Sequence, residues 1–174
     1  MAEVPDVSAR LERAVDELDG TIKDIRRTIF ALGALDSGTD VQTEIEKLVG
    51  RAAATMKLTP TLRIEGPIRS MVDAHIVPDL LAVLGETLSN ASRHAEASSV
   101  EVVVSVGEDV VLQVIDNGKG MAEGVAESGL GNMRQRAVKH GGTFAVRSEP
   151  GLGTCVTWTV PAASDSGDAS LVRS

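Results

Sequence analysis

VIDNGKGM, residues 114–121, joins a strand-like sequence to a glycine-rich loop. The residues leading into it, DVVLQVID over 109–116, alternate in a way that predicts a half-buried β-strand. The strand ends at Asp116, whose carboxylate can accept a hydrogen bond from an exocyclic amine. Gly118 and Gly120 follow, and glycines let a backbone turn tightly around a ligand. Ordinary turn chemistry explains the same residues, so both interpretations stay open for this segment alone.

A polar stripe on a predicted helix is the second candidate for ligand binding. The helix is expected from about Pro78 to Ala95. Within GETLSNASRH, the residues Glu86, Asn90 and Arg93 stand at i, i+4 and i+7, roughly opposite a leucine face. The stripe suits a metal-chelated phosphate, with Asn90 offering a carbonyl oxygen to Mg²⁺ and Arg93 a charge to phosphate oxygens. For this helix alone, a solvated polar face is the simpler interpretation.

A third segment, SGLGNMRQRA over residues 128–137, places two glycines before a predicted helix. Gly129 and Gly131 precede the helix, which is expected from about Asn132 to His140. Free amides at a helix start, reached through flexible glycines, can form a cradle for an anion. Glycine-rich entries to helices are common, so this segment is weak support when it is taken by itself.

The fourth segment, EPGLGTCVTW over residues 149–158, lies between two predicted strands. It contains Gly151, Gly153 and Thr154, and a hairpin turn explains it without any function. Two standard nucleotide motifs are excluded. No string has the glycine, lysine and hydroxyl spacing of a P-loop, and Glu123 stands where a dinucleotide fingerprint needs its third glycine.

An unbroken heptad pattern occupies residues 8–35, near the N-terminus. Apolar residues recur at alternating spacings of three and four, at Leu11, Val15, Leu18, Ile22, Ile25, Ile29 and Leu32. A lone helix cannot bury such a seam. The pattern therefore predicts a coiled coil or a helical bundle, most naturally with another chain. DSGTD, residues 36–40, is expected to be a linker.

Beyond the linker, helices and strands alternate. An amphipathic helix is expected from about Val41, with a start marked by Thr39 and Gln42 in the spacing of a capping box. Strands are predicted at 59–66, 99–107, 109–116, 143–148 and 154–160. The order predicts an α/β sandwich behind a helical arm. The polar residues 161–174 are expected to form a disordered tail.

Composition excludes several classes of function. The formal net charge of -8 argues against nonspecific binding to nucleic acid or anionic membranes, which require a positive field. With two Phe, one Trp and no Tyr, stacking on bases is not expected either. The three histidines fall on separate predicted elements and Cys155 is a lone cysteine, so no metal-thiolate site is predicted. Apolar runs are short and no signal-peptide pattern is visible, which favours a cytoplasmic protein.

The four segments, taken in this order, resemble one family. GETLSNASRHAEAS, VIDNGKGM, SGLGNMRQRAVKHGG and SEPGLGTCVTWTVP are similar to the N, G1, G2 and terminal GT motifs of the catalytic ATP-binding domain of histidine kinases. This is the GHKL or Bergerat fold, and the resemblance covers about residues 41–160. It implies a two-layer α/β sandwich with a mixed sheet. The four segments resemble those of the histidine kinase subfamily that pairs with response regulators of the NarL/LuxR type.

The N-terminal helix adds to the resemblance. LDGTIKDIRRTIFAL, residues 18–32, is similar to the second helix of that subfamily's dimerisation domain, so residues 1–35 are expected to be the end of a truncated phosphoacceptor domain. Within it, DIRRTIFAL is similar to actinobacterial haem-GAF sensor kinases of the DevS/DosT kind. The resemblance implies a homodimer in the full-length protein, a histidine-bearing dimerisation domain and a NarL/LuxR-type response regulator as partners.

The resemblance also implies how the base of ATP is held. Asp116 would accept a hydrogen bond from the adenine 6-amino group, and Gly118 and Gly120 would let the chain pass beside the base. His94 would lie near the base or the ribose. Thr154 would support the base side through a water molecule.

On the phosphate side, the resemblance implies a second set of residues. Asn90 would ligate Mg²⁺ and Arg93 would approach the phosphates. Gly129 and Gly131 would present backbone amides to the phosphates, and Leu130 between them belongs to the same ATP-binding set.

Glu86 would stand where this family places the general base that polarises the attacking histidine. Two features depart from the family. The segment MAEGVAES, residues 121–128, is a short lid without the phenylalanine box of many kinases. The acceptor histidine is expected N-terminal to residue 8, so this chain should bind ATP without phosphorylating itself. Two alternatives remain: a GHKL serine kinase of the anti-sigma-factor type, and a non-catalytic module that dimerises and responds to ATP.

Overall fold

The computed structural model describes residues 10, 14, 17, 18, 21, 40–121 and 127–163 of the 174-residue chain. Packing divides the chain into two compact units, Met1–Thr39 and Asp40–Ser174. In the first unit the described residues are helical, and Leu18, which belongs to the predicted heptad seam, is 61% exposed. The rest of the seam and most of the predicted linker and tail lie outside the described residues.

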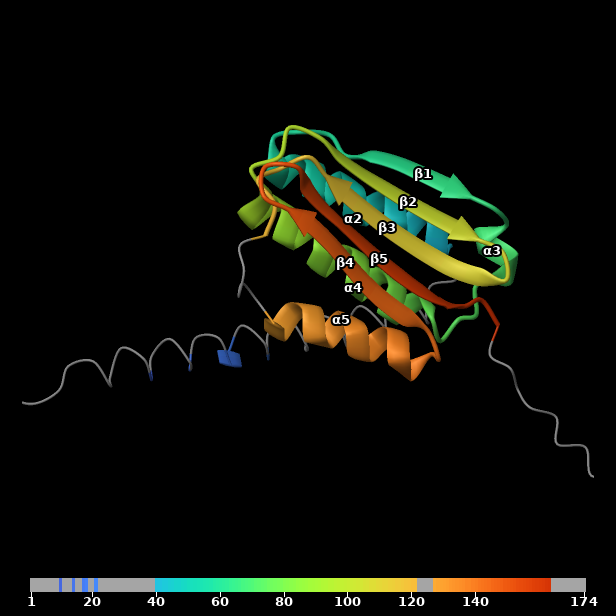
Figure 1. Ribbon diagram of the computed structural model, residues 1–174. Coiled ribbons are helices and arrows are strands. Elements are labelled where there is room, and N and C mark those ends of the chain that lie inside the picture. The colour runs from blue at the N-terminus through green and yellow to red at the C-terminus, as the bar shows by residue number, and fades with distance from the viewer. Residues whose placement is uncertain are drawn as a thin grey trace, which may run out of the picture. The chain divides into compact units, whose positions relative to one another are not determined.

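A five-stranded mixed sheet forms one layer of the second unit, as Figure 1 shows. The strands are β1 (Thr61–Glu65), β2 (Val100–Val106), β3 (Asp109–Asp116), β4 (Thr143–Glu149) and β5 (Gly153–Pro161). Their order across the sheet is β1-β2-β3-β5-β4. β1 runs parallel to β2, and the other neighbours are antiparallel. β2 and β3 therefore form one hairpin, and β4 and β5 form a second one.

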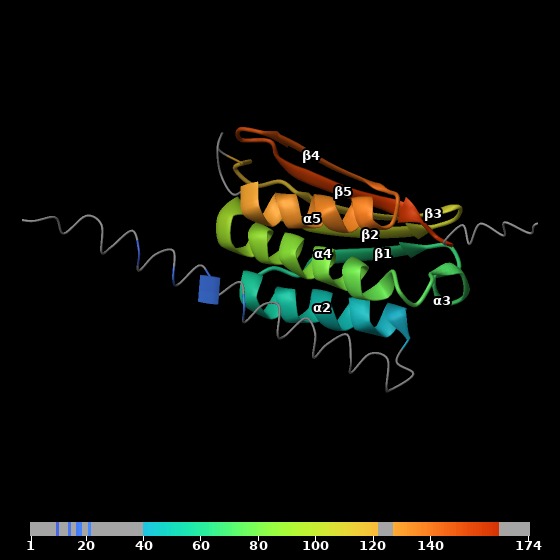
Figure 2. The ribbon, with the colours of Figure 1, turned by 90° about the horizontal axis from the view of Figure 1, so that it is seen from below.

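Helices form the second layer. α2 (Val41–Met56), α4 (Val77–Asn90) and α5 (Glu127–Lys139) lie side by side against one face of the sheet, with α4 in the middle (Figure 2). The helix-facing positions of the strands alternate with positions on the opposite face, as the period of two in their sequences predicts. The two-layer α/β sandwich predicted from the motifs is confirmed.

Aliphatic side chains fill the space between the layers. The largest fully buried ones include Ile45, Leu80, Leu84, Leu112, Met133 and Trp158. Trp158 of β5 is the one aromatic residue in this group, so the core is built from Val, Leu, Ile and Ala, as the composition requires. Within the part of the chain that the structure describes, no helix is long and apolar enough to cross a membrane.

The central helix ends in an unusual turn. α4 stops at Asn90 and continues as a π-helical turn, η1 (Ala91–Ala95), so the predicted end at Ala95 holds for the two pieces together. A π-turn bonds residue i to i+5 and changes which residues share a face. Such turns are frequent at functional sites. The turn closes at Glu96, which takes a left-handed conformation with a φ of 50°.

Two helix starts differ from the prediction. The N-cap of α2 is Asp40, one residue after the predicted Thr39, and Asp40 forms no side-chain cap; Thr39 itself lies outside the described residues. Gln42 instead donates to Glu46 one turn later. α5 begins at Glu127, five residues before the predicted start at Asn132, and its glycines lie inside the helix.

The helix extends further toward its N-terminus because its apolar periodicity does so. Leu130, Met133 and Ala137 are spaced by three and four, and the last two are almost fully buried. A helix covering all three has to include Gly129 and Gly131.

A short helix, α3 (Ile68–Met71), was not predicted. Ala162, just beyond β5, is buried and its backbone N–H donates to the Glu108 carbonyl.

Candidate functional site

A cavity of about 260 Å³ opens between the end of α4, the turn η1 and the end of β3. Six of the residues singled out from the sequence line it: Asn90, His94, Asp116, Gly120, Leu130 and Thr154. They come from four separate segments of the chain. The structure therefore brings together residues from all four motifs. The remaining walls of the cavity are mostly small or apolar and include Thr87, Ala91, Val114, Met121 and Val156, which lie within the motifs but had been given no role of their own.

Asp116 is the buried charged residue among those lining this cavity. It is 8% exposed, at the end of a strand whose other inward residues are aliphatic. The N–H of Gly118 donates to Asp116 Oδ1 over 2.9 Å, which fixes the orientation of the carboxylate. Among the described residues, Asp116 Oδ2 has no hydrogen-bond partner. A ligand amine can therefore donate to Oδ2 without displacing any protein contact.

Close backbone packing explains the glycines after Asp116. A Cβ at Gly118 would overlap the carbonyl of Ala95 in η1, and the N–H of Lys119 donates to that same carbonyl over 2.8 Å. Gly120 has a φ of +77°, a conformation that side chains disfavour, and its Cβ would meet the Glu149 carbonyl. The glycines thus allow the loop to pass between η1 and the turn after β4.

Asn117 holds the same loop from its other side, a role the motifs did not indicate. Its side-chain oxygen accepts from the N–H groups of Ser98 and Ser99 at 3.0 and 2.9 Å, and its Nδ2 donates to Ser98 Oγ over 2.9 Å. An asparagine at the first position after a strand is an ordinary turn signal, so sequence alone gave no reason to expect a long-range clamp.

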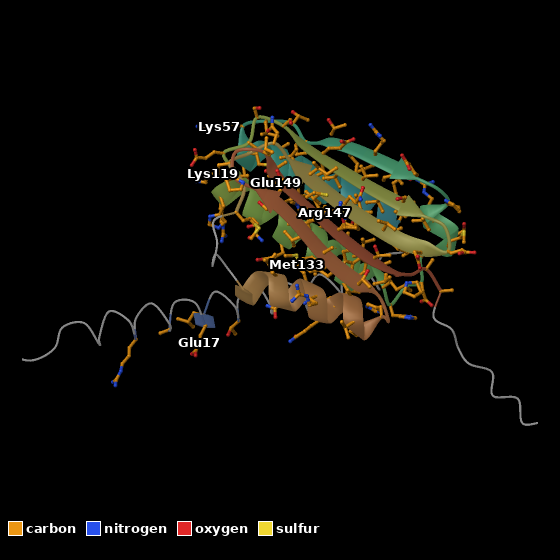
Figure 3. All side chains as sticks on the ribbon, viewed as in Figure 1. Glu17, Lys57, Lys119, Met133, Arg147 and Glu149 are labelled. Carbon is orange, nitrogen blue, oxygen red and sulfur yellow. The ribbon has the colours of Figure 1, made fainter. Side chains whose placement is uncertain are left out.

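Lys119 forms an ion pair with Glu96 at 2.7 Å, where both side chains are exposed. The hydrogen bond from Lys119 and its charge hold the pKa of Glu96 below its ordinary value. Figure 3 shows Lys119 and Glu149 gathered at the same end of the sheet. Exposed ion pairs contribute little to stability, so Lys119 matters more as part of the cavity wall than for folding.

Glu86 lies against the start of α5, outside the cavity wall. A Cβ added to Gly129 would stand 3.2 Å from Glu86 Oε1, so glycine at this place leaves room for the carboxylate. Gly129 is the third residue of α5, and the first four N–H groups of a helix have no partner within it. Gly131, two residues further on, is already past the first free amides and has no close neighbour.

Arg93 is placed apart from the other site residues. It lines a second cavity, of about 280 Å³, together with Arg51 of α2 and Ser89 of α4. The π-turn accounts for the difference, because it rotates Arg93 away from the face that an uninterrupted α-helix would give it. The predicted helical stripe of Glu86, Asn90 and Arg93 is therefore not a single face of this structure.

The far end of α5 is anchored by ion pairs to the first turn of α4. Asp79, whose side chain is 6% exposed, accepts hydrogen bonds from Arg136, from Lys139 at 2.9 Å and from His140 at 2.8 Å. Burial alone would raise the pKa of Asp79, but the hydrogen bonds from Lys139 and His140 and the nearby charges outweigh it and lower the pKa. This anchor fixes the helix that carries Leu130 into the cavity wall.

Replacing Asp79 with asparagine is expected to lower the free energy of unfolding by about 2–3 kcal/mol, because Arg136 and His140 would stay shielded without a carboxylate. Chemical denaturation measures this change. Asp73→Asn is the control, since its partner His75 is 57% exposed, and should cost less than about 1 kcal/mol.

The same residue makes stability depend on acid. Because the folded-state pKa of Asp79 is lowered, its contribution is complete above its ordinary pKa of 3.8 and is lost as the pH falls through the folded value. The parent should therefore lose more stability than Asp79→Asn on acidification below about pH 4. Equal acid sensitivity in the two proteins would contradict this origin.

A comparison with known families bears directly on this cavity. The family model described as histidine kinase-, DNA gyrase B- and HSP90-like ATPase matches residues 76–164, which include α4, the loop after β3 and both β4 and β5. The chain belongs to this ATPase family. The cavity at Asp116 is formed mostly by the matched residues. This part of the chain is therefore the ATP-binding catalytic domain of a histidine kinase.

The relatives with curated names are sensor histidine kinases and sensor proteins. The sensor histidine kinase LiaS of Bacillus subtilis is 31% identical over 176 residues, covering 88% of this chain and 47% of the relative. The sensor histidine kinase LnrJ of the same organism is 34% identical over 88 residues, 50% of this chain and 22% of the relative. The sensor protein VraS of Staphylococcus aureus is 37% identical over 86 residues, 47% of this chain and 25% of the relative. The chain thus spans about half or less of the relatives' length.

Solved structures share the fold. The blue-light activated histidine kinase of Erythrobacter litoralis EL346 aligns with a TM-score of 0.68 at 20% identity, over 87% of this chain and 51% of that one. The histidine kinase domain of the same protein aligns with a TM-score of 0.67 at 17% identity, over 93% of this chain and 89% of that one. At these identities the likeness concerns the sandwich and its strand order.

Proposed function

We propose that the whole protein is a sensor histidine kinase, which transfers the γ-phosphoryl group of ATP to a histidine of its dimerisation domain. The observation that carries this proposal is Asp116 at the cavity wall, with one carboxylate oxygen held by Gly118 and the other left for a donor. The adenine 6-amino group is such a donor, whereas guanine carries an acceptor at that place. The names of the relatives support the kinase reaction.

On the base side, apolar walls from Val114 and Val156 suit a flat heterocycle, since ligand pockets are mostly apolar with a few placed polar groups. His94 lines the cavity on η1 and is proposed to lie near the base or the ribose. Thr154 stands opposite Asp116 in the register of β3 and β5 and is proposed to support the base through water. Gly120 gives the loop its turn, while Gly118 packs beneath the cavity against η1.

On the phosphate side, Asn90 lines the cavity one helical turn after Glu86. Its side-chain oxygen fits a Mg²⁺ ion that takes most of its ligands from phosphate and water, which is how proteins usually hold this metal. Mg²⁺ would neutralise phosphate charge. Among the described residues, no group of three His, Cys, Asp or Glu could hold a metal ion by itself.

The start of α5 and Arg93 are proposed to complete the phosphate site. Leu130 lines the cavity, and the free backbone amide of Gly129 beside it is proposed to bind the phosphates. Gly131 is proposed to contribute mainly by letting the helix start approach the nucleotide. Arg93 is exposed, and it reaches the phosphates only if its side chain turns away from the second cavity. These local charges allow an acidic chain to bind ATP.

We propose a homodimer as the working state, with residues 8–35 contributing to a histidine-bearing dimerisation domain. The resemblance of the four motifs to one kinase subfamily supports a NarL/LuxR-type response regulator as the partner. It also supports a cytoplasmic position for this part of the protein. Kinship with the DevS/DosT kind rests on DIRRTIFAL, residues 24–32, alone, while the named relatives are of the LiaS and VraS types.

The proposed function is tested by titrating the chain with Mg-ATP and then supplying a dimerisation domain that carries an acceptor histidine. The expected product is phosphate that is labile in acid and stable in base. Label on serine instead would favour the anti-sigma-factor type of kinase. ATP binding without any label would favour the non-catalytic module, and no ATP binding would contradict all three.

A further inference from the structure

Ser148, a residue outside every motif role described above, is bonded to two parts of the cavity wall. It lies on β4 directly opposite Thr154 of β5, which in turn lies opposite Asp116 of β3. Ser148 Oγ accepts from the N–H of Met121 over 2.7 Å and lies 3.0 Å from Thr154 Oγ1. Met121 and Thr154 both line the cavity, whereas Ser148 does not.

The three strands therefore carry a polar row that ends at a backbone amide. The row consists of Asp116, Thr154, Ser148 and the N–H of Met121. The residues flanking Thr154 and Asp116 on the same face are aliphatic, such as Val114 and Val156. A hairpin of this kind needs no hydroxyl for its own pairing. The hydroxyls are placed where they set the geometry of the cavity.

The protons of this row are constrained. A serine hydroxyl has one proton and two lone pairs, and the Met121 amide occupies one lone pair of Ser148. The single proton of Ser148 can go to the Gly153 carbonyl at 3.2 Å or to Thr154 Oγ1 at 3.0 Å. If Ser148 donates to the Gly153 carbonyl, Thr154 donates to Ser148 and can only accept from a ligand. If Ser148 donates to Thr154, the proton of Thr154 is free for the cavity.

We propose that Ser148 is a positioning residue of the nucleotide site, which holds Met121 at the wall and sets whether the Thr154 hydroxyl donates to or accepts from the ligand. It thereby contributes to the preference for adenine over guanine, whose edges differ in their donors and acceptors. This inference rests on the proposed function, because it concerns the same pocket. Ser148 acts through Met121 and Thr154 and does not itself contact the base.

Two variants of nearly equal shape separate this role from packing. Ser148→Thr keeps the hydroxyl and Ser148→Val removes it, and both β-branched residues suit a strand. Ser148→Val should weaken Mg-ATP binding about three- to tenfold, the effect of losing one net hydrogen bond. Ser148→Thr should restore most of the affinity. Ser105→Ala, on the sheet face away from the helices, is the control and should match the parent.

Calorimetric titrations with Mg-ATP and Mg-GTP decide the inference, together with thermal unfolding of each nucleotide-free variant. The expected result is a lower ratio of ATP to GTP affinity in Ser148→Val, with a melting temperature close to that of Ser148→Thr. If Ser148→Val binds both nucleotides as the parent does, or loses affinity for both equally, the positioning role is wrong while ATP binding by the parent still stands. A parent that binds no ATP would overturn the proposed function itself.

Discussion

Glu86→Gln should slow phosphate transfer to an acceptor histidine by at least about a hundredfold, the typical contribution of a general base. Glutamine keeps the shape of the side chain beside Gly129 but cannot take a proton. In the proposed reaction, the carboxylate polarises the imidazole N–H while the nitrogen–phosphorus bond forms and ADP leaves. Glu86 does not line the cavity of Asp116, so the affinity for Mg-ATP should change less than about threefold.

The split between rate and affinity is the diagnostic part of this prediction. Single-turnover transfer to a supplied dimerisation domain measures the rate, and calorimetry measures the affinity. Glu101→Gln is the matched control, since Glu101 lies on the opposite face of the sheet and pairs with Arg63 at 3.1 Å. Equal rates for Glu86→Gln and the parent would remove Glu86 from the reaction, and a parallel loss of ATP affinity would make it a binding residue.

Asp116→Asn should weaken Mg-ATP binding by about a hundredfold. A hydrogen bond to a charged group contributes about 1.5–3 kcal/mol, and replacing the acceptor with a donor costs more than losing the bond. The reason is geometric. The Gly118 N–H requires an acceptor at the position of Oδ1, so an asparagine would turn its NH₂ group toward the cavity. Two donors, the amide NH₂ and the adenine 6-amino group, would then face one another.

The same geometry makes a second expectation for Asp116→Asn. Guanine offers an acceptor where adenine offers its amine, so the ratio of ATP to GTP affinity should fall in the variant. Competition calorimetry with the two nucleotides measures the ratio. Asp109→Asn, at the exposed start of the same strand, should leave both affinities unchanged. An unchanged ATP affinity in Asp116→Asn would show that the base does not bind at this carboxylate.

Much of the sandwich could be predicted from local patterns because four of its five strands form two hairpins with short connections. DVVLQVID and the strand before it form a hairpin through a tight turn, and TFAVRS and TCVTWTV form another. Period-two alternation in these segments reports directly on which face is buried. The four motifs converge because each one lies at the end of an element that points to the same edge of the fold.

Other features depend on contacts that no local pattern encodes. Asn117 reads as a turn residue, yet its partners Ser98 and Ser99 lie eighteen or more positions away. Asp79 reads as an acidic residue in a first helical turn, although it accepts hydrogen bonds from Arg136 and Lys139 of α5 and from His140 just after that helix. Both depend on how separate helices and loops pack, which alternation and spacing do not report.

The predictions for the position of Arg93 and for the start of α5 were wrong because each relied on a local pattern. An α-helical wheel placed Arg93 beside Asn90, but the π-turn after Asn90 changes the phase of the helix. Glycine propensity delayed the predicted start of α5 to Asn132, whereas burial of Met133 and Ala137 favours a longer helix. At the start of α5, tertiary packing outweighed the local preference against glycine in a helix, which is about 1 kcal/mol per residue.

A crystal structure of the chain with Mg²⁺ and a non-hydrolysable ATP analogue tests the role of Asp116 most directly. We expect the adenine between Val114, Val156 and Met121, with its 6-amino group within hydrogen-bond distance of Asp116 Oδ2, and the phosphates toward Asn90 and the start of α5. Density for the base elsewhere, for example in the second cavity beside Arg51, would contradict the assignment of Asp116 on which the proposed function rests.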